Sequence, residues 1–408
     1  MANFDPAAAT AAYLAELTPA QHALAKAYTQ GGHWMLLWGF LVSAASAWII
    51  IRLGVLKGIS NGVEKLPFWR WVRFLLTAWL CALAYTLLDT ALGLPRAAYG
   101  WWRETHYHLT SQPFGDWLRD AAKGAVISAI LFPLFLMVVY SIMRASKQRW
   151  WLWASGFAAV AFLFLQVISP IYIEPVFNKF TLAPAGPVRD EVVAMAKANG
   201  VPSDKIYIYD GSRQSNRYTA NVAGLGGTAR VAMSDVMFKK GADIAQVRGV
   251  VGHEMGHYVH QHALWLTLGL TLVAMISFWL ANLLFPTAAR LLGAAGVQGI
   301  SDPVGLPVFM VVLGFVALVT TPLQNTIIRT AEADADSYSL QHENEPDGLS
   351  RGLVKTIEYR AATPGKLEEF LFYDHPSVGS RIRKAMDWKA AHMKDAATPA
   401  APTPAATK

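Results

Sequence analysis

The residues of this chain best suited to chemistry lie between positions 253 and 257, where the sequence reads His-Glu-Met-Gly-His. Two histidines four positions apart project from one face of an α-helix, so the imidazoles of His253 and His257 can bind one metal ion. Glu254 lies between them and can act as a general base toward an attacking water molecule. This spacing is typical of the zinc site of a peptidase.

A third ligand is expected further along the chain. Residues 243–251 carry apolar side chains at helical spacing and lead into the histidine pair, which predicts that the pair lies on a helix. A second helical stretch contains Glu332, whose carboxylate is suited to be the third ligand. Asp334 should point to a different helical face and leave the metal alone. The alternative interpretation is a coincidental pair of surface histidines.

The composition indicates a membrane protein. The 408 residues are 54% hydrophobic and only 15% charged, with 15 tryptophans, which is unlike a soluble domain. The net charge of +7 needs no nucleic acid to explain it, because basic residues beside anionic headgroups suffice. Six apolar runs reach spanning length, the second only if Asp89 is tolerated. These runs are residues 34–51, 74–95, 124–143, 150–173, 263–289 and 303–328.

One long polar segment, residues 174–261, separates the fourth and fifth runs. Residues 187–196 predict an amphipathic helix, and residues 206–209 predict a short strand. Two further strands, 221–224 and 229–233, are predicted to form a hairpin around a glycine turn. A sheet edge beside a zinc helix would let an extended peptide add as another strand.

Four motifs, in order along the chain, resemble those of the type I CAAX prenyl endopeptidases, a family of polytopic membrane zinc metallopeptidases. The similarity extends from about residue 34 to 385, and the compact, alanine-rich sequence looks bacterial. The motifs are Ile-Glu-Pro-Val-Phe-Asn-Lys-Phe at 173–180, the histidine pair with His262, Glu332 with Asp336, and Asp374-His375-Pro376 with Arg381.

The resemblance implies one Zn²⁺ per chain, bound by His253, His257 and Glu332, with Glu254 as general base. It implies further roles for four residues. His375 would donate to the oxyanion, with a structural role at a helix entry as the alternative. Arg381 would orient His375 or add positive charge. Asp336 would hydrogen-bond a zinc-bound imidazole or simply face water. Asn221 would hold the substrate backbone, although the family pattern has its asparagine where Thr219 stands.

The predicted fold is mainly α: a polytopic six-helix membrane bundle with an inserted small α+β zincin-like metallopeptidase domain. The expected division is a polar N-terminal segment, four transmembrane helices, the zincin-like domain, two transmembrane helices, a third-ligand helix with the His/Arg motif, and a disordered tail. In the same order these cover residues 1–30, 31–173, 174–262, 263–328, 329–395 and 396–408.

The predicted function is peptide-bond hydrolysis by an integral-membrane zinc endopeptidase acting on peptide or protein substrates, including membrane-associated ones. The partners indicated are substrate and lipid bilayer, with no nucleic acid and no obligatory protein partner. Two alternatives stay open: a heat-shock-type quality-control metallopeptidase, and a non-catalytic scaffold or transporter with a vestigial zinc site.

The expected location is the bacterial inner membrane. The resemblance places the zinc domain on the cytoplasmic side. Basic residues in the short loops point the other way, because loops rich in lysine and arginine are usually cytoplasmic. The loops concerned carry Arg52, Lys57, Lys65, Arg70, Arg144, Lys147 and Arg149.

Overall fold

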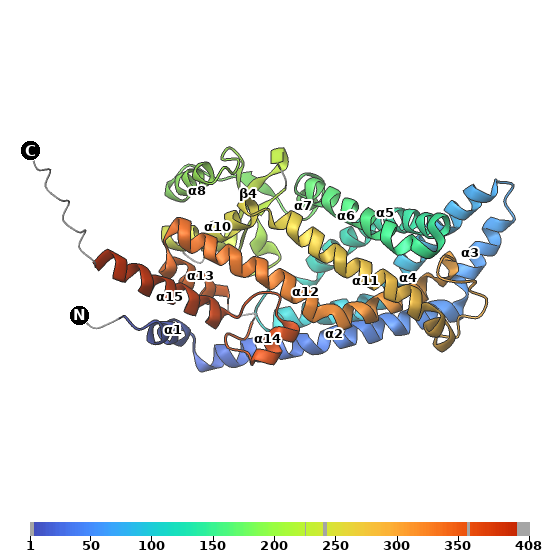
Figure 1. Ribbon diagram of the computed structural model, residues 1–408, viewed down its shortest axis with the longest axis horizontal. Coiled ribbons are helices and arrows are strands. Elements are labelled where there is room, and N and C mark those ends of the chain that lie inside the picture. Colours follow the sequence, from blue (N-terminus) through green and yellow to red (C-terminus); the bar gives the residue numbers. More distant parts are fainter. Residues whose placement is uncertain (1–3, 225, 240–242, 357–359, 398–408) are drawn as a thin grey trace, which may run out of the picture.

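The computed structural model describes residues 4–224, 226–239, 243–356 and 360–397. Within these ranges, six long helices run along the length of the molecule (Figure 1). They correspond in order to the six predicted apolar runs. They are α2 (Pro19–Leu53), α4 (Arg70–His106), α5 (Phe114–Ser146), α6 (Trp150–Ile168), α11 (His262–Leu291) and α12 (Leu306–Glu343).

By length and composition, five helical stretches of the described chain can cross a membrane. The longest of them, Phe114–Phe177, contains both α5 and α6. The chain reverses between these helices at Lys147, whose φ of 46° is left-handed, and the two helices pack against each other. Because one of the five stretches contains two long helices, the structure agrees with the six predicted spans.

Local sequence explains where the first long helix begins and ends. Thr18 caps α2: its Oγ1 accepts the Gln21 N–H at 3.2 Å, while Gln21 Oε1 accepts the Thr18 N–H at 2.8 Å. Pro19 takes the first helical position, where its missing N–H does no harm. The helix ends at Gly54, whose φ of 65° favours glycine.

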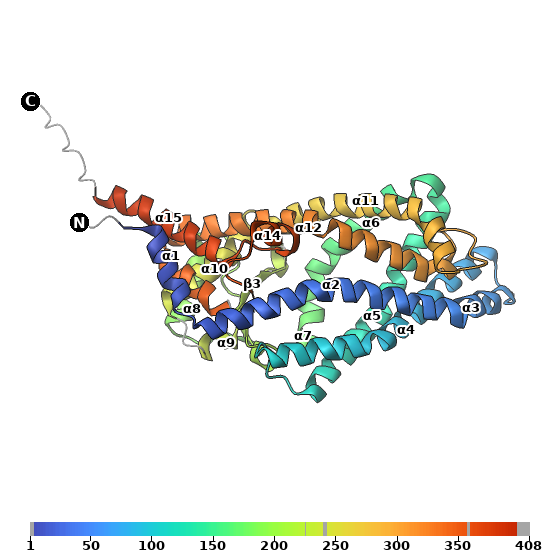
Figure 2. The ribbon, with the colours of Figure 1, turned by 90° about the horizontal axis from the view of Figure 1, so that it is seen from below.

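The long helices alternate in direction, so the connections gather at the two ends of the molecule (Figure 2). One end holds α3 (Val55–Glu64) and the turn between α11 and α12. The other end holds the residues between α6 and α11 together with both ends of the described chain. The two ends of the described chain lie at the same end of the bundle because six, an even number of spans, connect them.

A four-stranded sheet lies at that second end, within the described residues, with the strand order β1-β2-β4-β3. The predicted hairpin is confirmed, since β3 and β4 are antiparallel. The first strand and the parallel pairing of β2 with β4 were not predicted. The strands are β1 (Phe180–Leu182), β2 (Ile206–Tyr209), β3 (Ala220–Ala223) and β4 (Arg230–Ser234).

The helix α10 carries the histidine pair and packs between the sheet and α12. Val247, Val251 and Met255 on its apolar face are fully buried, in one cluster with Val231 and Met233 of β4. Each such side chain contributes about 1.5–3 kcal/mol through burial. The remaining helices are α1 (Pro6–Ala15), α7 (Glu174–Phe177), α8 (Pro187–Ala198), α9 (Asp235–Lys239), α10 (Ile244–Val259), α13 (Pro346–Thr356), α14 (Lys366–Phe372) and α15 (Val378–Ala397).

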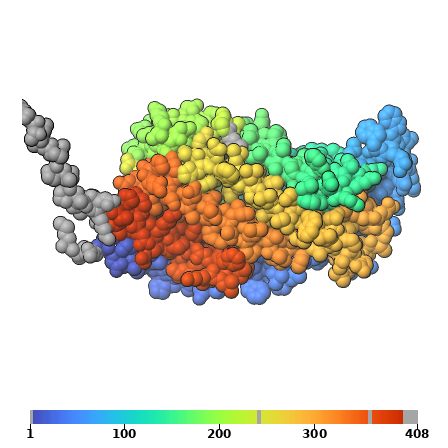
Figure 3. All heavy atoms as spheres, viewed as in Figure 1, coloured from blue at the N-terminus to red at the C-terminus, as the bar shows by residue number. Residues whose placement is uncertain are grey.

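The two ends of the described chain pack together. Tyr13 and Leu14 of α1 lie against a cluster that includes Ile382 of α15, and Figure 3 shows both segments, dark blue and red, at the same end. Residues 19–30 of the expected polar segment belong to α2. Of the expected disordered tail, residues 398–408 lie outside the described residues, and α15 extends to Ala397.

Candidate metal centre

The helix α10 places the two histidines on one face. Asp243 caps its N-terminus, with Oδ1 accepting the Gln246 N–H at 2.7 Å. One turn separates His253 from His257, and their Nε2 atoms lie 3.2 Å apart. The predicted helix and the convergence of the imidazoles are therefore both present in the structure.

Glycines on α10 let α12 approach closely. A Cβ built on Gly256 would lie 2.9 Å from Tyr338 Cβ and 3.1 Å from Ala335 Cα, both on α12. A Cβ on Gly252 would lie 2.5 Å from Glu343 Cγ. Real Cβ atoms rarely make such short contacts, so glycine at these positions allows the close packing that brings Glu332 to the histidines. The role of Gly252 and Gly256 was not predicted from the sequence.

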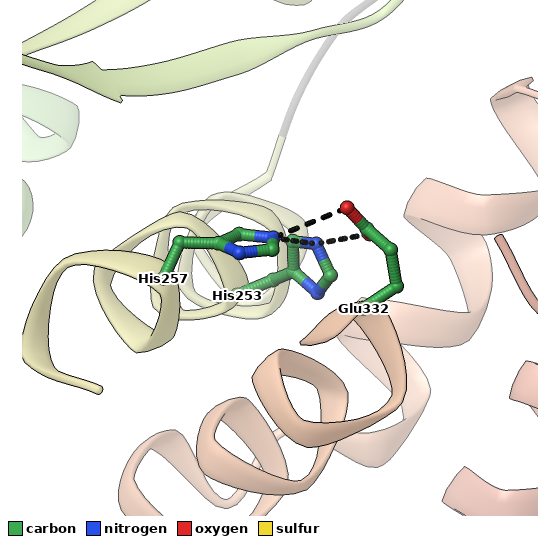
Figure 4. A group of neighbouring side chains, drawn as sticks. All are labelled: His253, His257 and Glu332. Atoms are coloured by element: carbon green, nitrogen blue, oxygen red, sulfur yellow. Dashed lines mark hydrogen bonds and ion pairs between the residues drawn. The ribbon is translucent and has the colours of Figure 1, made fainter. Parts of the chain in front are cut away.

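Glu332 reaches across from α12 to both histidines (Figure 4). Its Oε2 lies 3.2 Å from His253 Nε2, and its Oε1 lies 3.4 Å from His257 Nε2. Ligands held at about 2.0–2.1 Å in a tetrahedron lie about 3.4 Å apart. Glu332 Oε2 is buried and accepts no hydrogen bond from any residue that the structure describes. These three residues therefore fit one zinc-sized cation.

Asp336 lies one helical turn after Glu332 and is buried. Its Oδ1 accepts a hydrogen bond from His253 Nδ1 at 2.9 Å. Arg381 donates to both of its oxygens, from Nε at 2.8 Å and from Nη2 at 2.6 Å. Burial alone would lower the pKa of His253, but its hydrogen bond with Asp336 and the nearby Glu332 carboxylate raise it to about 9. A position that favours a protonated imidazole also favours a bound cation.

Glu254 projects into a cavity of about 170 Å³ that His253 also lines. Burial raises the pKa of its carboxyl above the ordinary value, although His253 and His257 oppose this. A carboxylate with a raised pKa is a stronger base near neutral pH. The other lining residues include Tyr218, Thr219, Ala220, Arg360, His375 and Arg381.

His375 also contacts Glu332, with its Nε2 3.2 Å from Glu332 Oε2. Its Nδ1 donates to Asp374 Oδ1 at 2.9 Å, and Arg360 Nη2 lies 2.7 Å from the same oxygen. Burial alone would raise the pKa of Asp374, but the His375 hydrogen bond and the Arg360 charge hold it well below its usual range. The carboxylate therefore fixes the orientation of the imidazole. His375 was predicted from the sequence, whereas Arg360 was not.

Asn221 lies on β3, the strand at one edge of the sheet. Its neighbours Thr219 and Ala220 line the cavity, whereas Asn221 is not among the described lining residues. Its buried Oδ1 has no hydrogen-bond partner within the described chain. The family pattern has its asparagine at position 219, and in this structure it is Thr219, not Asn221, that lines the cavity.

Asp334 contacts two histidines that its position on α12 did not predict. It points away from the first metal site, as expected, but it contacts His260 and His262 at the junction of α10 and α11. His262 Nδ1 in turn lies 2.9 Å from His257 Nδ1. The signal in the sequence was the histidine five positions after His257, whose partner on α12 could not be identified without the fold.

Comparison with known proteins decides the family. Residues 183–389 match the model of peptidase family M48, and residues 6–179 match that of the CAAX prenyl protease N-terminal region with five membrane helices. The chain belongs to peptidase family M48. It is an integral-membrane metalloendopeptidase of the zinc-dependent type that this family comprises, in accord with the sequence-based prediction.

The similar proteins match most of the chain. The uncharacterized metalloprotease YhfN of Bacillus subtilis is 26% identical over 381 residues, covering 90% of this chain and 86% of that protein. CAAX prenyl protease 1 of Saccharomyces cerevisiae is 25% identical over 344 residues, covering 78% and 73%. The crystal structure of S. mikatae Ste24p has the same fold, with a TM-score of 0.73 at 20% identity, covering 91% and 90%.

Proposed function

We propose that the chain hydrolyses peptide bonds with a single zinc ion held by His253, His257 and Glu332. The observation that carries this assignment is the spacing of the ligand groups: the two Nε2 atoms lie 3.2 Å apart, and each lies 3.2–3.4 Å from an oxygen of Glu332, close to the separation of ligands in tetrahedral zinc coordination. Zinc bound there would lower the pKa of a water molecule toward about 7 and polarise the scissile carbonyl. The protein itself supplies the proton transfers and the orientation.

Glu254 is the proposed general base. Its carboxylate accepts a proton from the attacking water and passes that proton to the nitrogen of the leaving amine. Its position beside His253 in the cavity supports this role. The raised pKa of its carboxyl supports it as well, because proton return requires a group that holds a proton between the two steps.

His375 is the proposed donor to the oxyanion that develops on the scissile carbonyl. Asp374 engages its Nδ1, so the nitrogen that can donate to the oxyanion is Nε2. Arg381 acts indirectly on the metal site. It donates hydrogen bonds to both oxygens of Asp336, and Asp336 accepts one from the ligand His253. We assign Arg381 and Asp336 to the orientation of this ligand.

The substrate is proposed to be an extended peptide that adds to the edge of β3. The terminal place of β3 in the strand order leaves one edge for another strand. Ala220, the first residue of β3, lines the same cavity as Glu254, so a peptide on this edge would present its backbone to the site. We keep Asn221, on the same strand, as a proposed contact to the substrate backbone.

Membrane-associated peptides are the proposed substrate class. The yeast and human relatives are named CAAX prenyl proteases, and a prenylated CAAX peptide is one member of this class. We propose the bacterial inner membrane as the location, with the zinc site on the cytoplasmic side and no obligatory protein partner. The zincin-like domain of residues 174–262 would be completed by residues 329–395, which supply the third ligand.

The ligand assignment is tested by zinc content. His253→Ala, His257→Ala and Glu332→Ala should each reduce the zinc bound per chain in the detergent-purified protein, and hydrolysis of a quenched fluorescent peptide should fall with it. His392→Ala on the exposed surface of α15 is the matched control and should keep both. A ligand variant with a full zinc content would remove that residue from the proposed site.

A further inference from the structure

A second group of candidate ligands lies beside the first. His260 and His262 flank the junction between α10 and α11, and Asp334 lies on α12. One ligand atom from each residue lies within 4.8 Å of the other two. His262 Nε2 is 3.0 Å from Asp334 Oδ2, and His260 Nδ1 hydrogen-bonds to the same oxygen. Gln261, with a left-handed φ of 54°, turns the chain so that both imidazoles meet one carboxylate.

We propose that His260, His262 and Asp334 bind a second divalent transition-metal ion, and that this ion opposes zinc binding at the first site. Two imidazoles and one carboxylate suit zinc, copper or nickel, whereas calcium and magnesium prefer oxygen ligands. The side chains of His260 and Asp334 are 40% and 47% exposed, so an ion can enter from solvent. The side chain of His262 is only 8% exposed, which fixes its ring.

The coupling runs through the two nitrogens of His262. His257 directs Nε2 toward Glu332, so its proton resides on Nδ1 when Nε2 binds an ion. That Nδ1–H points at His262 Nδ1, 2.9 Å away, which must accept it. His262 then carries its own proton on Nε2 and donates it to Asp334 Oδ2. While the first site is occupied, His257 therefore carries its proton on Nδ1 and His262 carries its proton on Nε2.

An ion at the second site requires the lone pair of His262 Nε2. A neutral His262 would then carry its proton on Nδ1, where it would face the Nδ1–H of His257. His257 would lose its hydrogen-bond acceptor, which weakens a metal ligand. Coupling between two sites is reciprocal and typically amounts to about 5- to 150-fold in affinity. We expect a reduction of that size in the zinc affinity of the first site.

The direction of this coupling rests on the proposed role of His257 as a ligand, whereas the second site itself does not. The experiment therefore counts ions. Full-length protein in detergent is dialysed against zinc buffers of increasing free concentration, and zinc per chain is measured together with peptide hydrolysis. The wild type should bind one ion at low free zinc, together with the onset of hydrolysis, and a second at higher concentration. Glu332→Ala, which lacks the first ion, should bind its one ion about 5- to 150-fold more tightly than the wild type binds its second.

Variants separate the two sites. His260→Ala should bind one ion only at every free zinc concentration, and Asp334→Asn should do the same. His257→Ala should lose the first ion and still bind one at the second site. His392→Ala, which leaves both groups intact, should behave as the wild type. A wild type that binds one ion at every zinc concentration, or a His260→Ala variant that still binds two, would overturn the proposal.

Discussion

The two histidines of the first site differ in what supports them. The Nδ1 of His253 meets the buried carboxylate of Asp336 directly, whereas the Nδ1 of His257 meets His262, which in turn meets Asp334. The sequence predicted Asp336 because one helical turn separates it from Glu332. The contact of His257 with His262 and, through it, with Asp334 combines residues from α10, α11 and α12, so the full arrangement follows only from the fold.

Loss of the proposed oxyanion donor should affect the chemical step rather than the metal. His375→Ala should lower kcat by about 10²- to 10³-fold, the usual effect of removing one such donor. KM and zinc content should change little, because His375 is not a proposed ligand. Steady-state kinetics and elemental analysis of the purified variant measure both quantities.

His392→Ala again serves as the control for this experiment, since it removes a histidine far from the cavity. An unchanged kcat in His375→Ala would leave His375 as a structural residue. Loss of zinc in parallel with activity would show instead that His375 helps to hold the metal.

At the scale of elements, the approach of α12 to α10 depends on glycine. Gly256→Ala should lower the free energy of unfolding by about 1–3 kcal/mol, the usual effect of overpacking a tight contact. The new Cβ would press on Tyr338 Cβ and Ala335 Cα, which moves Glu332 away from the histidines. Thermal unfolding and zinc content should therefore both decline.

A matched variant is Gly124→Ala on α5, where a Cβ meets no described atom within 4 Å. It should leave zinc content near the wild-type value and should not lower stability, because the position is open and alanine is the better helix former. Equal behaviour of the two variants would mean that the close packing at Gly256 does not position the third ligand.

Local patterns predicted some elements and missed others for identifiable reasons. The strand β2 begins and ends at the predicted residues 206 and 209, and the glycine turn predicted the β3–β4 hairpin. The strand β1 has only three residues, too few for an alternating pattern. The parallel pairing of β2 with β4 is a long-range choice that local sequence does not encode. The helix α1 was included in the polar N-terminal segment, because its packing against α15 cannot be seen in the local sequence.

At the scale of the whole molecule, the zinc site and both ends of the described chain lie at one end of the bundle (Figures 1 and 2). The basic turn around Lys147 lies between α5 and α6, away from the zinc site. If the zinc site faces the cytoplasm, that turn faces outward, against the usual distribution of positive charge. The family resemblance and the distribution of basic residues therefore predict opposite orientations in the membrane.

Reporter fusions decide between these orientations. We expect green fluorescent protein fused after Lys408 to fluoresce, because it folds in the cytoplasm, and alkaline phosphatase inserted at Lys147 to be active, because it folds outside. The exchanged result, with active phosphatase after Lys408 and fluorescence at Lys147, would place the zinc site outside the cytoplasm.

The central claim is that Glu254 takes the proton while the zinc ligands remain intact. Glu254→Gln keeps the size and shape of the side chain and removes only its basicity. The most direct measurement is zinc content and peptide hydrolysis in one preparation of this variant. The account predicts zinc at the wild-type level with hydrolysis nearly abolished. Full hydrolysis by the variant, or loss of zinc together with activity, would contradict it.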